Sequence, residues 1–303
     1  MPGVKEQDLR VKSEFDRYRG IFEEYLGTSS ALRNIGVPEK LSEAMDYSLF
    51  AGGKRLRPVL CLAAAERFGC QPHDALPLAL GFEMLHTATL IHDDLPCMDD
   101  DDIRRGKPSN HAVFGETLAV LAGDALLALS LEYPLCKSDK IVPGRLLKAM
   151  QIFSSAIGPA GVCGGQVLDM DTAPAKTDPS YVRRIASLKT GTLIRASVTA
   201  GAALGTDDPA ILACCWDYGT HIGSAFQIID DILDVSSTAE ELGKTPGKDA
   251  EQDKATHVTV YGMEKAAEMA REETGLAREA ILRILPGDDF LSEFPGYLLR
   301  RTH

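Results

Sequence analysis

The stretch TATLIHDDLPCMDDDDIRRGK, residues 87–107, decides how this chain is read, because a row of aspartates ends an apolar, helix-like segment. The stretch AFQIIDDILDV, residues 225–235, repeats that arrangement. A buried carboxylate without a counter-charge is very costly, so both clusters need cations. Mg²⁺ prefers oxygen ligands and often bridges carboxylates to substrate phosphates. Arginines and lysines follow each cluster and suit phosphate oxygens, so the sequence indicates chemistry on a diphosphate.

The spacing of the aspartates predicts which of them share a face. Asp230 and Asp234 are four apart and lie roughly 40° from each other on a helix, so they can bind the same ions. Asp93 and Asp99 are six apart, which on a straight helix separates them by roughly 120°. Pro96 lies between them, lacks an N–H and clashes with the preceding turn. We therefore expect a bulge or kink that brings Asp99 back beside Asp93.

The other aspartates of the two clusters have different expected places. We expect Asp94 and Asp231 to complete the metal site, mainly by supporting the ligands, as metal-site carboxylates often require. The run 100–102 is expected to be mostly solvated. A solvated acidic loop is an alternative explanation for the first cluster alone, but it explains two such clusters poorly.

Composition excludes several classes of function. The 303 residues are 45% hydrophobic and 25% charged, which is typical of a soluble globular protein. The net charge of −12 argues against nucleic-acid binding but allows an anionic small substrate, because the local field matters more than the total. The seven cysteines show no CxxC pair, and the first residues lack an apolar targeting core, so we expect a reduced, cytoplasmic compartment. The longest apolar stretch, residues 117–129, is too short for a transmembrane segment.

Hydrophobic periodicity predicts a single all-α domain over residues 1–303. Apolar residues recur every three or four positions, and the alternation of apolar and polar residues that is typical of β-strands is almost absent. The segments 74–95 and 210–235 are apolar most of the way round, as central helices are, and each carries an aspartate cluster at its C-terminal end. We expect them to bring these ends to one cavity. The other predicted helices span residues 5–26, 39–51, 59–67, 116–131, 146–157, 162–170, 181–204, 265–285 and 294–301.

Several motifs occur together and in order along nearly the whole chain. They are GGKRLRP at 52–58, LIHDDLPCMDDDDIRRGKPSNH at 90–111, GGQ at 164–166 with Asp169, KTG at 189–191, FQIIDDILD at 226–234 and GKDAEQDKAT at 247–256. In this combination the chain resembles the trans-isoprenyl diphosphate synthases. The resemblance implies an isoprenoid-synthase-type bundle of about ten core helices around a deep central cavity, as a homodimer.

The resemblance also implies the reaction. Isopentenyl diphosphate would condense head-to-tail with an allylic diphosphate (dimethylallyl, geranyl or farnesyl), with release of pyrophosphate. The allylic C–O bond must ionise, and metal ions and cationic side chains stabilise the charge that develops on the leaving group. The implied cofactor is Mg²⁺, about three ions, with Mn²⁺ as a substitute.

The resemblance implies a role for each matching residue. Asp93, Asp99 and Asp230 would bind the metal, with Asp234 assisting. The allylic diphosphate would contact Arg104, Lys189 and Lys244, with Lys254 nearby, and the isopentenyl diphosphate would contact Lys54, Arg57, His86 and Arg105. Thr190 and Gln227 would present dipoles to the allylic cation, and Gln166 would contact substrate. Each residue taken singly has a structural explanation, such as a packed core histidine or a solvated lysine, and the complete set favours the site.

Residues one and two helical turns before Asp93 should line the pocket for the growing chain. Bacterial farnesyl diphosphate synthases usually carry an aromatic residue five positions before the first aspartate, where this chain has Ala88. We therefore predict a C20 product, geranylgeranyl diphosphate, with C15 farnesyl diphosphate as the alternative. Another helix could instead supply the pocket floor. The predicted chain-length residues are Met84, Leu85, Ala88 and Thr89.

Three other functions are weaker interpretations. A class I terpene cyclase needs no second diphosphate site, and Lys54, Arg57 and Arg105 argue against it. An HD-type phosphohydrolase would need further His and Asp ligands that the sequence does not place. A catalytically inactive partner subunit usually lacks one aspartate motif, and both are intact here.

Overall fold

The computed structural model describes residues 2–28, 36–171, 178–236 and 256–300. Within these ranges the protein is a bundle of helices with one two-stranded antiparallel hairpin, β1 (Ile103–Arg104) and β2 (Lys107–Pro108), which confirms the predicted all-α class. The helices are α1 (Pro2–Thr28), α2 (Glu39–Leu49), α3 (Leu56–Arg67), α4 (Pro72–Asp93), α5 (Asn110–Phe114), α6 (Glu116–Lys137), α7 (Pro143–Ile157), α8 (Val162–Met170), α9 (Pro179–Ile185), η3 (Ala186–Gly191), α10 (Thr192–Gly205), α11 (Pro209–Ser236), α14 (His257–Tyr261), α15 (Met263–Leu282) and α16 (Phe290–Arg300).

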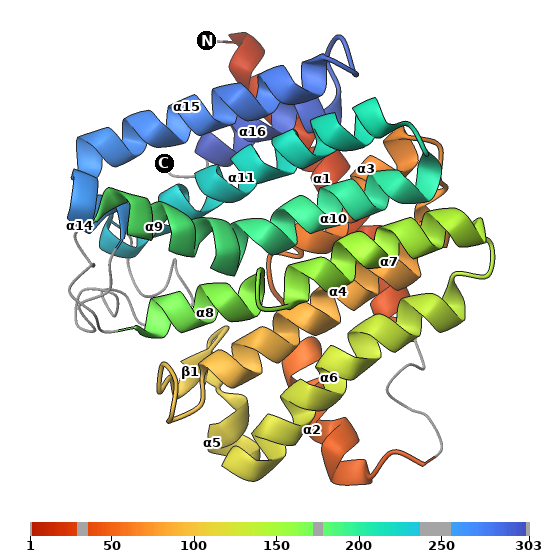
Figure 1. The fold of residues 1–303 in the computed structure, drawn as a ribbon, viewed down its shortest axis with the longest axis vertical. Coiled ribbons are helices and arrows are strands. Elements are labelled where there is room, and N and C mark those ends of the chain that lie inside the picture. Colours follow the sequence, from red (N-terminus) through yellow and green to blue (C-terminus); the bar gives the residue numbers. More distant parts are fainter. Residues whose placement is uncertain (1, 29–35, 172–177, 237–255, 301–303) are drawn as a thin grey trace.

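The helices α4 and α10 form the interior of the bundle. Both are buried over most of their length, as expected for helices that are apolar all round. α4 packs on α3 and α6, and α10 packs on α3, α7 and α11 (Figure 1). Small residues permit close approach, since a Cβ on Gly201 would lie 2.3 Å from the carbonyl oxygen of Cys61. This close packing joins α10 to α3.

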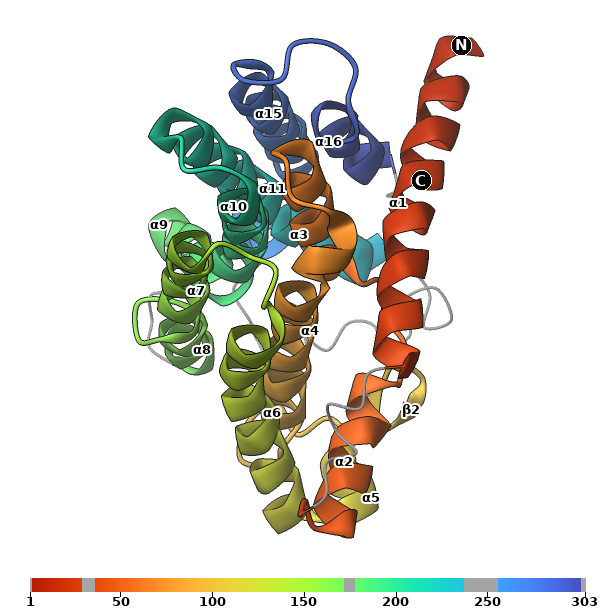
Figure 2. The same ribbon diagram turned by 90° about the vertical axis from the view of Figure 1, so that its right-hand side faces the viewer.

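The first helix closes one side of the bundle. α1 runs along the side opposite α7 and α8 (Figure 2). Its inner face packs on α16, where the rings of Phe15 and Phe294 stack with centroids 6.2 Å apart. Arg300 donates to Asp8 at 2.8 Å, and Arg10 pairs with the buried Glu293. These contacts join the two ends of the described chain.

Most predicted helices differ from the structure by a few residues at their ends, and the predicted helix 116–131 continues to Lys137. Two others differ in ways that matter for the site. The segment 74–95 ends as a helix at Asp93, before Pro96. The segment 181–204 is continuous but contains the π-helical turn η3, in which the Thr192 hydroxyl donates to the carbonyl of Ser187 at 2.9 Å. The five-residue helices α5 and α14 were not predicted, because a segment of that length shows no helical period.

Two stretches, Glu116–Lys137 and Pro143–Met170, are long and apolar enough to cross a membrane by length and composition alone. Core helices of soluble proteins pass the same test. The second stretch also bends, because α7 ends at Ile157 and α8 begins at Val162.

Candidate active site

The first acidic wall is formed where α4 ends. The amide of Asp99 donates to the carbonyl of Asp93 at 2.9 Å, so the chain turns back on itself directly after the helix. Asp100 takes a φ of +50°, a left-handed conformation that aspartate tolerates better than most residues. Asp99 therefore lies beside Asp93 as predicted, but through termination of the helix rather than a kink within it. Enclosure by protein raises the pKa of Asp93; nearby Lys189 opposes this shift and Asp99 adds to it.

Two further aspartates of this cluster hold an arginine. Asp94 is buried and accepts a hydrogen bond from Arg104 Nε at 2.9 Å. Asp100 and Asp102 are exposed, which agrees with the expectation that residues 100–102 are mostly solvated. Asp101 is the exception: it is buried, with an oxygen 3.4 Å from Arg104 Nη2. Burial raises the pKa of Asp94 to about 6 although Arg104 opposes this. These two carboxylates therefore position Arg104.

The second acidic wall is the C-terminal end of α11. Asp230 faces the same cavity as Asp93. Asp231 is buried and accepts from Gln227 Nε2 at 2.7 Å, from the His257 amide at 2.8 Å and from His257 Nδ1 at 2.7 Å. Asp231 thus fixes Gln227 and the start of α14, which agrees with a supporting role. Asp234 is buried one turn further along.

The π-helical turn η3 supplies the third side of the site. It points the Thr190 hydroxyl at Gln227 Oε1, 2.6 Å away, and Lys189 Nζ at Asp169, 2.5 Å away. Such turns widen a helix and often occur at functional sites. α8 packs tightly against it, since a Cβ on Gly165 would lie 2.2 Å from the amide nitrogen of Lys189. Enclosure works against the charge on Lys189, but Asp93 and Asp169 raise its pKa overall.

The basic residues Lys54, Arg57 and Arg105, with His86, form the basic wall of the chamber. Arg57 Nε is buried without a hydrogen-bond partner in the part of the chain that the structure describes, so it is a donor available to an anion. Enclosure by protein lowers the pKa of Arg57 to about 10, with Glu83 opposing and Arg105 adding to the shift. Enclosure and the surrounding arginines, Arg57 first, hold the pKa of His86 well below its ordinary value, so this imidazole is neutral.

These walls enclose one chamber of about 510 Å³. Two predicted residues, Asp94 and Asp234, are buried outside its lining, and Lys244 and Lys254 lie outside the described residues. Three residues that line the chamber had no predicted role: Glu83, Phe226 and His257. Of these, Glu83 could have been singled out from the sequence, because it is a charged residue in the apolar middle of a predicted helix, three positions before His86. The predicted residues brought together are Lys54, Arg57, His86, Thr89, Asp93, Asp99, Arg104, Arg105, Gln166, Lys189, Thr190, Gln227, Asp230 and Asp231.

An apolar cavity of about 680 Å³ adjoins the chamber. Its wall includes Leu85 and Ala88 from α4 as predicted, whereas Met84 is fully buried and is not in the lining. The residues that line both cavities are Thr89, Asp93, Val162 and Gln166. Both amide atoms of Gln166 are buried without a hydrogen-bond partner among the described residues, at the junction of polar and apolar space.

The carboxylates fit magnesium that is shared with a ligand. Among the described residues, no group of three or more His, Cys, Asp or Glu side chains is close enough to hold a metal by itself. Asp93 and Asp230 nevertheless face one chamber, and the raised pKa of Asp93 reflects a charge that enclosure destabilises. Oxygen ligands with open positions for substrate phosphate are what Mg²⁺ requires.

A diphosphate held by metal in the chamber would direct an attached hydrocarbon chain into the apolar cavity. A helical bundle that pairs two such spaces defines the class of isoprenyl diphosphate synthases. The Polyprenyl synthetase family model matches residues 38–280, and the chain belongs to this family.

Relatives and solved structures agree with this assignment. The chain is 44% identical to a dimethylallyltranstransferase of Fischerella ambigua, over 88% of this chain and 78% of that protein. It is 42% identical to the large subunit 1 of a heterodimeric geranylgeranyl pyrophosphate synthase of Arabidopsis thaliana, over 92% of this chain and 78% of the relative. A geranyltransferase of Helicobacter pylori, complexed with magnesium and isoprenyl diphosphate, superposes with a TM-score of 0.82 at 31% identity, covering 95% of this chain and 96% of the other.

Proposed function

We propose that this isoprenyl diphosphate synthase condenses isopentenyl diphosphate with allylic diphosphates, releases pyrophosphate and makes geranylgeranyl diphosphate as its main product. The observation that carries the proposal is the pair of adjoining cavities, one charged and one apolar, with Thr89, Asp93, Val162 and Gln166 common to both. A substrate with a diphosphate head and a prenyl chain matches that pair.

Asp93, Asp99 and Asp230 would hold Mg²⁺, with Asp94, Asp231 and Asp234 in support. The number of ions, three, comes from the family resemblance. When bound, the metal neutralises charge on the diphosphate leaving group. Arg104 and Lys189 line the same chamber and would contact the allylic diphosphate, as would Lys244 and Lys254 outside the described residues.

The basic wall would bind the isopentenyl diphosphate. Lys54, Arg57, His86 and Arg105 line one side of the chamber, and a neutral His86 can donate a hydrogen bond to phosphate without titrating near neutral pH. The Thr190 hydroxyl and the Gln227 amide form a connected pair of dipoles, which Asp231 holds in place. Such preorganised dipoles stabilise developing charge, here that of the allylic cation.

The product length follows from the wall of the apolar cavity. Ala88 and Thr89 are small and lie one turn from Asp93, so this wall leaves space for a chain longer than geranyl. Farnesyl diphosphate remains the alternative product.

Product analysis tests the proposal. The purified protein is incubated with Mg²⁺, isopentenyl diphosphate and either geranyl or farnesyl diphosphate, and the dephosphorylated alcohols are separated by length. Geranylgeraniol from farnesyl diphosphate is the expected result. Farnesol alone from geranyl diphosphate, with farnesyl diphosphate unused, would assign the C15 product. No extension of any allylic substrate would overturn the activity.

We further propose that the protein works as a homodimer in the cytoplasm. Leu121 and Leu135 of α6, Leu147 of α7 and Val167 of α8 are each more than half exposed. In Figure 2, α7 and α8 lie on the side of the bundle away from α1. Exposed apolar surface of this kind marks association. The seven cysteines are free thiols, which suits a reducing compartment. Light scattering after gel filtration should give twice the chain mass, and Leu121→Glu with Leu147→Glu should give the monomer.

A further inference from the structure

A buried carboxylate lies inside the basic wall and has no part in the proposed chemistry. Glu83 is on α4, three residues before His86, so both are on one helix face. Its side chain is 2% exposed, and it lines the chamber together with Arg57 and Arg105. A carboxylate near a bound diphosphate is repulsive, so its presence there needs a physical reason.

One oxygen of Glu83 joins two arginines from distant parts of the chain. Arg55 Nη1 donates to Glu83 Oε1 at 2.6 Å, and Arg105 Nη2 lies 3.5 Å from the same oxygen. Arg57, which lines the same wall, also interacts electrostatically with Glu83. The carboxylate thus offsets the mutual repulsion of three guanidinium groups.

The backbone at both arginines is left-handed. The φ of Arg55 is +51° and that of Arg105 is +54°, which is unfavourable for residues other than glycine and persists only where surrounding contacts hold it. Arg105 also packs directly over Gly53, where a Cβ would lie 3.0 Å from its Cζ. The loop before α3 and the β1–β2 turn are therefore fitted to each other through these side chains.

The two arginines differ in what remains available to a ligand. Arg55 is buried and also donates to Glu23 at 2.7 Å and to the carbonyl of Leu49 at 3.1 Å. Besides its packing over Gly53, Arg105 makes a long hydrogen bond of 3.4 Å to the carbonyl of Ser48, and it lines the chamber. Arg55 thus anchors Glu83, and Glu83 in turn aims Arg105.

We propose that Glu83 is a positioning residue for the isopentenyl diphosphate site: it fixes Arg105 against the Arg55 anchor, so that the basic wall is arranged before the diphosphate arrives. The inference rests on the proposed function. Prearranged donors bind without the loss of freedom that ordering them would require, which is why a nearby negative charge strengthens binding overall.

The test is isothermal titration of isopentenyl diphosphate into metal-free protein, which isolates this site from the metal-dependent allylic site. Glu83→Gln keeps the shape and removes the charge, and it should weaken isopentenyl diphosphate binding by about tenfold to a hundredfold. In steady-state assays the KM for isopentenyl diphosphate should rise in the same proportion while the KM for the allylic substrate is unchanged. Glu83→Asp keeps the charge and should bind with intermediate strength.

Glu23→Gln is the matched control, because Glu23 also contacts Arg55 but does not contact Arg105. It should leave isopentenyl diphosphate binding unchanged. If Glu83→Gln binds isopentenyl diphosphate as tightly as the unaltered protein or more tightly, the proposal is overturned, and Glu83 acts on the diphosphate mainly by repulsion. A parallel rise of both KM values, or an equal loss in Glu23→Gln, would also overturn it and leave Glu83 a purely structural role. Failure of the unaltered protein to bind isopentenyl diphosphate in this titration would overturn the positioning proposal, whereas the proposed function stands or falls with the extension of allylic substrates in the product assay.

Discussion

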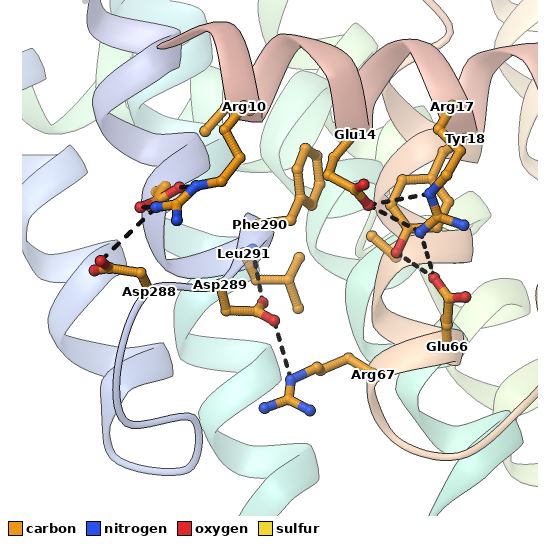
Figure 3. A pocket seen from close by; sticks show the side chains of 13 residues that line it. Arg10, Glu14, Arg17, Tyr18, Glu66, Arg67, Asp288, Asp289, Phe290 and Leu291 are labelled. Carbon is orange, nitrogen blue, oxygen red and sulfur yellow. Dashed lines mark hydrogen bonds and ion pairs between the residues drawn. The ribbon is translucent and has the colours of Figure 1, made fainter. Parts of the chain in front are cut away.

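Two cavities of this protein are rich in charge, and they differ in how the charges are arranged. One is the candidate active chamber of about 510 Å³; the other is a pocket of about 420 Å³ between α1, α3 and α16 (Figure 3). In that pocket each arginine is paired with a nearby carboxylate, in most cases from a neighbouring element, as Figure 3 shows. Arg17 lies 2.9 Å from Glu14 and 2.6 Å from Glu66. The other pairs are Arg67 with Asp289, and Arg10 with Asp288 and Glu293.

The active chamber also contains close ion pairs, since Lys189 Nζ lies 2.5 Å from Asp169 and Arg55 Nη1 lies 2.6 Å from Glu83. The contact between the basic wall and the second acidic wall, Lys54 with Asp230, is longer, at 3.9 Å. The pKa directions differ between the two cavities. Burial works against the charge of Glu66, but hydrogen bonds from Arg17 and Tyr18 lower its pKa overall, whereas enclosure raises that of Asp93. Ionisable groups whose charged form is destabilised by burial are typical of ligand-binding sites. Ionisable groups whose charged form is stabilised by neighbouring partners are typical of structural contacts.

The largest expected effect is that of Asp93→Asn. Losing a metal ligand should reduce turnover by about a thousandfold or more, because the charge on the leaving group is no longer neutralised. The melting temperature of the metal-free protein should be unchanged or higher, since a destabilised charge is removed. Activity assays and thermal melts check this, and Mg²⁺ with pyrophosphate should raise the melting temperature of the unaltered protein but not of this variant. A variant with full activity would remove Asp93 from the metal site.

Ala88→Tyr should change the product while leaving catalysis intact. The ring would fill the apolar cavity one turn below Asp93. The variant should therefore convert geranyl diphosphate to farnesyl diphosphate and stop there, without extending farnesyl diphosphate further. Chromatography of the dephosphorylated products gives the answer, with Ala88→Ser as the control that keeps the space. An unchanged product length would mean that another helix supplies the floor.

Asp231→Asn should mainly affect stability. Asp231 accepts three hydrogen bonds, two of them from His257, and its replacement leaves buried donors with weaker partners. We expect a loss of about 1–3 kcal/mol in the free energy of unfolding, measured by urea denaturation. Turnover should fall far less than in Asp93→Asn. An equal loss of turnover and Mg²⁺ dependence would instead make Asp231 a direct ligand.

The smallest effect is expected in the second pocket. Glu66→Gln should leave activity unchanged and reduce stability at neutral pH by less than about 1 kcal/mol, because the ion pair with Arg17 is partly exposed. The pKa of Glu66 is lower in the folded protein than its ordinary value of 4.5, so its contribution is present above that pH. The difference in the free energy of unfolding between Glu66→Gln and the unaltered protein, measured by urea denaturation, should therefore disappear as the pH falls below 4.5. Any change in turnover would connect this pocket to the active site.

Much of the fold and part of the site could be predicted from local patterns. The interior helix α4 was predicted from its apolar composition, and the aspartate clusters at the ends of α4 and α11 from the sequence. The prediction that α11 is also central was wrong in part, because ten of its 28 residues are buried, whereas α10 is buried over most of its length. Asp101 was misplaced because nothing adjacent in the sequence shows that Arg104 folds back over it. Met84 was misplaced because a helix that is buried all round gives no indication of which side faces a cavity.

The sequence by itself determined the helical class, the two aspartate clusters and the family, because periodicity and motif order are local properties of the chain. Only the tertiary structure decided which charges face the chamber and which are paired within the protein. Asp94 holds Arg104, Asp231 holds Gln227 and His257, and Glu83 joins Arg55 to Arg105. The physical reason is that the state of a charge depends on its burial and on its nearest partners, and in two of these three cases the partners come from distant parts of the chain.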